Sequence, residues 1–204
     1  AWREASNDRS FSLLRAHDLK VALAEGGTVP QGRLRAVLDG GGPLTGADAE
    51  ERLSVATQVD ASRPGEAILV PGRLVGVDVA AGPRVDGLHP DGGRVLAAGD
   101  DGRDVAVLEA NFAAARGLPA TGTLRVTGGR LAWVGRARSP EWFVVAPPGG
   151  SWGGEAVYAG VFTSLATAQR VAGRPGRVNE LVVRLRAGVP VAEARAAPAA
   201  RPAA

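Results

Sequence analysis

The chain has 204 residues, 45% of them hydrophobic and only 4% aromatic, so it can bury a large core built mainly from small aliphatic side chains. Its 29 glycines and 14 prolines require frequent turns and short elements, which excludes a helical bundle. The formal net charge is only +3, and no basic stripe is interleaved with aromatic residues, which argues against a nucleic-acid partner.

The absence of two residue types, cysteine and methionine, limits the kinds of site that the chain can form. The chain has no cysteine, which excludes disulfides, thiolate metal sites and a cysteine nucleophile. It has no methionine and begins at Ala1, so we expect an excised or processed segment of a longer protein. No apolar run approaches the roughly 20 residues that a membrane-spanning helix needs.

The first third of the chain is predicted to be rich in strands. Period-two alternation of apolar residues predicts strands at residues 18–23 and 52–59, and a short helix is expected at 33–38 between them. Two further strands are expected at 67–70 and 74–79, separated by Pro71 and Gly72.

Between about residues 83 and 148 short apolar segments alternate with turns of Gly, Asp and Pro. A small helix is expected at 109–116, ending at Gly117, and Gly128-Gly129 predicts a hairpin. The strands expected in this region are residues 95–97, 104–108, 123–126, 131–134 and 142–145.

The last third has a strand-helix-strand pattern. A strand is expected at 156–162, and Ser164 can cap a helix that runs to about residue 172 before Gly173. A second strand is expected at 178–185. Residues 191–195 begin as a helix, and we expect a frayed tail from about residue 197 because prolines follow.

These patterns predict an α+β fold with two lobes. The strand-helix-strand units at both chain ends are expected to share one sheet, because a two- or three-stranded sheet is marginal in water. Residues 1–82 and 149–204 would form this porter-like β-α-β lobe, and residues 83–148 an inserted β-rich lobe. The inserted lobe would have a small core of its own, formed by aromatic residues: Phe112, Trp133, Trp142 and Phe143.

No catalytic residue is predicted. Ser151 lies in a literal G-x-S-x-G, but a nucleophile elbow needs a preceding strand, a following helix and a later base histidine. Pro147 and Pro148 precede the motif, a strand pattern follows it, and no histidine lies beyond His89. We therefore interpret the motif as a turn in which Trp152 packs across the chain.

No metal or cofactor site is predicted either. His17 and His89 have no partner at metal-ligand spacing and are expected to be solvated loop residues. Gly40-Gly41-Gly42 lacks the Lys-Ser/Thr of a phosphate loop and is expected to be a linker. A calcium site remains an alternative for one acidic group whose spacing does not match an EF-hand loop: Asp86, Asp91, Asp100, Asp101 and Asp104.

The tryptophans are expected to be core residues. Trp133, Trp142 and Trp152 fall within about twenty residues of one another, and Trp2 lies near the start. An exposed pair would instead mark a surface for a partner.

The second half of the chain resembles a known family. Residues 108–126, with their A-A-A-R-G-L-P-A-T-G-T-L-R-V ending, are similar to the A-x-x-L-G-x-x-x-G-D-x-(apolar) signature of extracytoplasmic domains of FtsX-like, MacB-type ABC transporter permeases. Residues 131–141, 162–171 and 174–185 match the strand, helix and strand that follow. Thr123 stands where the family usually has Asp or Asn.

The resemblance implies a non-catalytic domain inserted after the first membrane helix of a permease subunit, on the extracytoplasmic side of the cell membrane. It implies that the permease subunit forms a dimer and pairs with a cytoplasmic ATPase subunit. It also implies that the domain handles hydrophobic or envelope cargo, binds an accessory envelope protein, or transmits force. Two alternatives stay open: a secreted protein- or ligand-binding module, and a secreted hydrolase.

Overall fold

The computed structural model describes residues 14–142 and 156–196. In chain order the elements are β1 (Leu19–Ala22), β2 (Val29–Pro30), η1 (Arg35–Gly40), η2 (Gly42–Leu44), β3 (Asp48–Asp60), β4 (Leu69–Val77), β5 (His89–Gly93), η3 (Ala98–Asp100), β6 (Val105–Glu109), α2 (Ala110–Ala115), β7 (Gly122–Val126), β8 (Gly129–Arg138), η4 (Pro140–Trp142), β9 (Ala159–Ser164), α3 (Leu165–Val171), β10 (Arg177–Val178), β11 (Glu180–Arg184) and α4 (Val191–Ala196).

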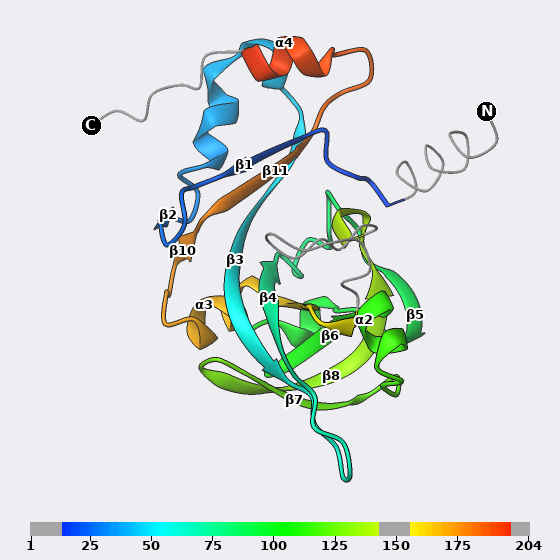
Figure 1. Cartoon of the computed structure of the whole chain (residues 1–204). Helices are drawn as coiled ribbons and strands as arrows, with labels where there is room; N and C mark the ends of the chain where they lie inside the picture. Colours follow the sequence, from blue (N-terminus) through cyan, green and yellow to red (C-terminus); the bar gives the residue numbers. More distant parts are fainter. Residues whose placement is uncertain (1–13, 143–155, 197–204) are drawn as a thin grey trace, which may run out of the picture.

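Most strands belong to one mixed sheet with the order β1-β11-β3-β4-β9-β6-β8-β5. Strand β7 pairs with both β3 and β8, so the pairings β3-β4-β9-β6-β8-β7-β3 form a closed circuit, drawn in the lower half of Figure 1. Strands β4 and β9 run parallel, as do β6 and β8. Closing the circuit removes the free edges that an open sheet would expose.

Strand β3 connects this circuit to the two ends of the chain. Its first residues, from Asp48 to Arg52, pair with β11, and its remainder pairs with β4. Strand β1 pairs with β11 on the other side, with Leu19 opposite Val183. The N-terminal strand therefore lies beside the C-terminal unit, as expected, and Figure 1 shows β1, β11, η1 and α4 together above the circuit.

The helices are short, and α3 is capped by Ser164 as expected, whereas Glu109 caps α2 instead of beginning it. The Ser164 side chain accepts a hydrogen bond from the Thr167 amide at the start of α3, and Glu109 accepts one from Phe112 at the start of α2. Helix α3 lies so close to β4 that a Cβ on Gly76 would come within 2.5 Å of the Ala168 Cβ. Gly76 thus permits the contact between this helix and the sheet.

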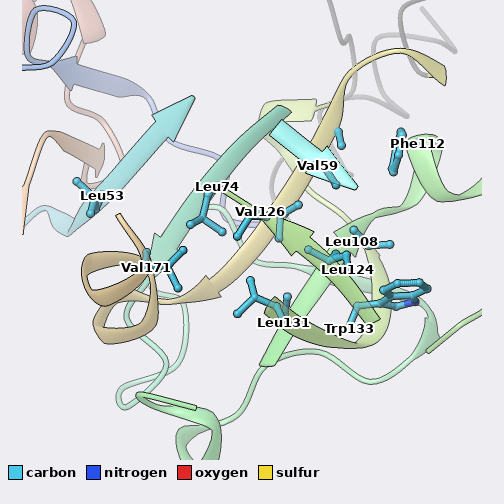
Figure 2. Close-up of a cluster of buried hydrophobic side chains, with 14 of the residues drawn as sticks. Leu53, Val59, Leu74, Leu108, Phe112, Leu124, Val126, Leu131, Trp133 and Val171 are labelled. Atoms are coloured by element: carbon cyan, nitrogen blue, oxygen red, sulfur yellow. The ribbon is translucent and has the colours of Figure 1, made fainter. Parts of the chain in front are cut away.

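The core is divided into two clusters of buried side chains. The larger one includes Leu53, Leu74, Phe112 and Trp133, which come from β3, β4, α2 and β8 (Figure 2). The smaller one is formed by seven buried residues, which are Val75, Val77, Val79, Val107, Ala137, Trp142 and Phe162. Trp133 and Trp142 are buried, which confirms the core prediction for these two, while Trp2 and Trp152 lie outside the described residues.

The aromatic residues do not form a separate core for the segment 83–148. Phe112 and Trp133 share a cluster with β3 and β4, and Trp142 stacks on Tyr158 at 5.8 Å. Strands β9 and β3, expected in the lobe of the chain ends, pair with β6 and β7 of the segment 83–148. The fold is mixed, with one large sheet and few helices, and its division into a porter-like lobe (1–82 and 149–204) and an inserted lobe (83–148) stays a prediction.

Residues 69–77 form one strand, whereas two strands broken at Pro71 were expected. Pro71 lies opposite Gln58, whose amide donates to the Thr127 hydroxyl beyond β3, away from β4. The proline's missing N–H is therefore not needed between β3 and β4. Pairing with β9 begins only at Gly72, so the other side of Pro71 is also unpaired.

The expected strand at residues 95–97 is also wrong, because the strand lies earlier, at His89–Gly93. Strand β5 is the last in the sheet order and, among the described strands, pairs with β8 alone, with an irregular register between Pro90 and Gly92. Proline and glycine are tolerated at such an edge. Trp142 ends the 3-10 turn η4 instead of beginning a strand, and residues 143–145 lie outside the described residues.

Candidate functional site

The most unusual feature of the structure is a buried arginine in the middle of β3. The Arg52 side chain is 1% exposed. Its Nη1 atom donates to Asp86 Oδ2 at 3.1 Å and to Glu141 Oε2 at 2.8 Å, and its Nη2 atom donates to the Val85 carbonyl at 2.9 Å. One guanidinium thus joins β3 to the loop after β4 and to η4.

The charges around Arg52 determine its ionisation. Burial acts to lower the pKa of the guanidinium, but the carboxylates of Glu50, Glu141 and Asp86 outweigh it and raise the pKa above its ordinary range. Glu50 Oε1 lies 3.5 Å from Arg52 Nε, and burial raises the pKa of Glu50. Arg52 remains charged because the neighbouring carboxylates replace the water that it has lost.

A second layer of charges continues the network toward β1 and β11. Lys20 Nζ lies 3.0 Å from Glu141 Oε1 and 3.1 Å from Glu180 Oε2. Burial acts to lower the pKa of Lys20, and the two carboxylates raise it above its ordinary value. Arg73, on β4, lies 3.4 Å from Glu180. The network therefore spans the sheet from β1 to β4.

His17 belongs to this network, which corrects its assignment as a solvated loop residue. Its Nδ1 atom lies 2.9 Å from Asp86 Oδ2 and 3.0 Å from Asp86 Oδ1, and its backbone amide donates to Asp86 Oδ1 at 2.9 Å. The hydrogen bond to Asp86 raises the pKa of His17. Burial acts to raise the pKa of Asp86, but His17 and Arg52 hold it below its ordinary value.

The backbone is constrained at the same place. Arg15 and Asp86 both have a positive backbone angle φ, 52° and 51°, which residues other than glycine rarely adopt. The Asp86 amide donates to the Arg15 carbonyl at 2.9 Å, and the Gly87 amide donates to the Leu14 carbonyl at 2.7 Å. Paired strain of this kind persists only where surrounding contacts fix it, and the Asp86 side chain supplies those contacts.

The network brings together three side chains that are far apart in the sequence, those of His17, Asp86 and Glu141. One ligand atom each of His17, Asp86 and Glu141 lies within 4.8 Å of the others. The guanidinium of Arg52 donates to both carboxylates, so it already supplies a positive charge to the oxygens that a divalent cation would need. In this structure the three side chains belong to an ion-pair network centred on Arg52.

The acidic group considered for calcium separates into different ion pairs. Asp100 pairs with Arg94 on both carboxylate oxygens, Asp104 pairs with Arg170, and Asp91 pairs with Arg138 at 3.3 Å. Asp86 belongs to the Arg52 network and Asp101 is exposed in a turn. These carboxylates do not converge, so the calcium alternative is wrong for this group.

The other candidates from the sequence have ordinary positions. His89 is exposed at the start of β5, and Gly41 and Gly42 link η1 to η2. Ser151 and its G-x-S-x-G lie outside the described residues. Among residues 14–142 and 156–196, none of the helices combines the length and the apolar character needed to cross a bilayer.

Comparison of folds identifies what the chain is similar to. No family model and no curated protein matches the sequence. The extracellular domain of the noncanonic ABC-type transporter YknZ from Gram-positive bacteria superposes with a TM-score of 0.53 and 10% identity, over 83% of both chains. The periplasmic region of MacB from Actinobacillus actinomycetemcomitans superposes with a TM-score of 0.51 and 14% identity, over 72% of this chain and 62% of that one.

The chain has the fold of these extracytoplasmic domains. The resemblance found in residues 108–185 is thereby confirmed at the level of the fold. In this chain the Arg52 network lies where the segment before β1 contacts the loop of Asp86 and Gly87.

The pH dependence of stability should report on His17. Because its pKa is raised by folding, the folded chain holds this proton more tightly than the unfolded chain. The contribution is complete below the ordinary pKa of about 6.5 and is lost as the pH rises through the higher folded value. Burial also raises the pKa of Glu50, so the stability that its proton contributes is likewise lost as the pH rises, but at lower pH than for His17. We expect the free energy of unfolding in urea to be larger at about pH 6 than at about pH 8.5.

The substitution His17→Gln should reduce this difference. His89→Gln is the matched control, since it removes the other imidazole of the chain, which is exposed. An equal loss of stability between the two pH values in wild-type protein and in His17→Gln would contradict the assignment.

Proposed function

We propose that this chain is the extracytoplasmic domain of an ABC transporter permease subunit and that it is non-catalytic. The observation that carries the proposal is the fold shared with the YknZ extracellular domain over 83% of both chains. The signature-like residues 108–126, which fold into β6, α2 and β7, support it independently. The domain would relay motion or handle hydrophobic cargo, an envelope substrate or an accessory protein.

The geometry supports a relay of motion. The segment that leads into β1 is held by His17 and by two backbone bonds to the loop of Asp86 and Gly87. Arg52 joins that loop to β3, and β3 continues into the closed circuit. A displacement of the N-terminal segment would therefore be transmitted to the circuit through short polar contacts, of which the one between Arg52 and Asp86 is buried.

The proposed partners follow from the proposed subunit. They are a cytoplasmic ATPase, a second permease subunit in a homodimer or a matched pair, and an accessory envelope protein; ATP chemistry would belong to the ATPase chain. The location would be the cell membrane, with this domain on its outer side. The alternative is a secreted binding module, which the same fold could serve. A secreted hydrolase is disfavoured because no histidine follows Ser151 in the sequence.

The gene provides the decisive test. In the complete reading frame we expect an apolar segment of about 20 residues shortly before the codon for Ala1 and further membrane segments after Ala204. The complete product should sediment with membranes, and external protease should cleave this domain in intact cells. A reading frame with a cleavable signal sequence and a stop codon after this segment, and a product in the medium, would establish the secreted alternative instead.

A further inference from the structure

A pocket of about 440 Å³ lies beside β1 and β11, the strands nearest to the two ends of the described chain. The lining residues come from β1, β11, η1, η2 and α4. Each of these elements contributes aliphatic side chains, among them Leu19, Leu38, Leu44, Leu181 and Ala194. The volume lies within the range of small-molecule sites.

The aliphatic lining is only partly covered. Leu19, Leu38 and Leu44 pack against the large core cluster but remain partly exposed, and Val21 is 46% exposed. Isolated exposed aliphatic residues are normal on protein surfaces, whereas here they surround one hollow. The hollow therefore presents an apolar surface suited to an aliphatic group.

The charged side chains of the lining are His17, Asp18, Lys20 and Arg195, and they differ in their partners. His17 is bonded to Asp86, and Lys20 is paired with Glu141 and Glu180. The Asp18 carboxylate accepts a hydrogen bond from the Leu185 amide. Arg195, on α4, is exposed and takes part in none of the ion pairs found among residues 14–142 and 156–196. An anionic group beside the apolar hollow would complement this guanidinium.

We propose that the pocket binds an anionic single-chain amphiphile of the fatty-acid type. Its aliphatic chain lies against Leu19, Leu38 and Leu44, and its carboxylate pairs with Arg195. The assignment deepens the proposed function, on which it rests, by naming a chemical class for the hydrophobic cargo.

Binding of fatty acids can be measured by titration calorimetry below their micelle concentrations. Laurate should bind at one site per chain, and affinity should rise on the order of fourfold for each methylene from octanoate to laurate, as expected for burial of aliphatic groups. Leu44→Trp should fill the hollow and weaken laurate binding at least tenfold. Leu69→Trp is the matched control, because Leu69 is 59% exposed on β4, and it should leave binding unchanged.

The head group is tested separately. Arg195→Glu should weaken laurate severalfold, while Arg130→Glu, an exposed arginine on β8, should not. Circular dichroism melting checks that each variant is folded, and Val37→Trp, on η1, replaces Leu44→Trp if the latter does not fold.

Four results would overturn the proposal. The first three are the absence of saturable laurate binding, binding that Leu44→Trp and Val37→Trp both leave unchanged, and equal affinity for dodecyltrimethylammonium. The fourth is a concentration-dependent dimer that Leu44→Trp abolishes, which would assign the hollow to a second copy of the chain. Failure of the permease proposal is detected in the gene and the cell fractions, so the two failures are distinguishable.

Discussion

Replacing Arg52 by methionine is expected to lower the free energy of unfolding by about 3–5 kcal/mol, the cost of breaking a buried ion pair on one side. Methionine retains an unbranched side chain but no charge, so Asp86 and Glu141 lose the donor that lies 3.1 Å and 2.8 Å from their oxygens. Both carboxylates would then be buried beside β3 without this cation. Glu50, also buried, would lose its nearest positive charge.

The measurement is urea unfolding followed by circular dichroism near neutral pH. Arg73→Met is the matched control, because this arginine is 38% exposed and pairs with Glu180 at 3.4 Å. Its removal should cost less than about 1 kcal/mol, as for other exposed pairs. A loss below about 1 kcal/mol for Arg52→Met would contradict the description of the network as desolvated.

A change of pH gives the same prediction an independent check. Carboxylates left without Arg52 should have a higher pKa in the folded than in the unfolded chain. Their protonated forms are then favoured by folding, so stability is lost as the pH rises. The difference between Arg52→Met and wild type should therefore be smaller at about pH 5 than at about pH 8.

Local signals in the sequence were sufficient for much of the secondary structure. The alternation at residues 52–59 predicted β3, Gly128-Gly129 predicted the β7–β8 hairpin, and Ser164 predicted the start of α3. Each of these depends on residues within one turn or one strand. The sequence signature at 108–126 added the fold family, because its glycines and apolar positions define β6, α2 and β7 as a unit.

The Arg52 network could not be predicted in this way. Arg52 meets Asp86 and Glu141 across 34 and 89 positions of sequence. Glu50, Glu51 and Arg52 are consecutive charged residues in β3, and a charged run of this kind usually indicates exposure to solvent. Here the loop of Val85 and Asp86 and the turn η4 cover the Arg52 side chain. Only the tertiary arrangement shows that the charges are buried.

Phe112→Ala is expected to destabilise the whole described fold by about 3–5 kcal/mol, because a large buried side chain is removed and a cavity is left. Phe112 is fully buried in α2, within the cluster that also holds Leu53 of β3, Leu74 of β4 and Val178 next to β11. The core is continuous from the circuit toward the chain ends. A cavity at Phe112 should therefore weaken strands that lie on both sides of the predicted lobe boundary.

Hydrogen exchange of backbone amides distinguishes a single cooperative core from two independently folding lobes. If the core is one cooperative unit, Phe112→Ala should lower protection of β8 and of β11 together, and urea unfolding should stay a single transition. Phe112→Leu, which keeps most of the apolar volume, is the control and should lose markedly less stability. If residues 83–148 form an independent lobe, β8 should lose protection while β11 keeps it, and two transitions should separate. In that case the hinge for relayed motion would lie between the lobes; in the cooperative case the motion would pass through β3 as one body.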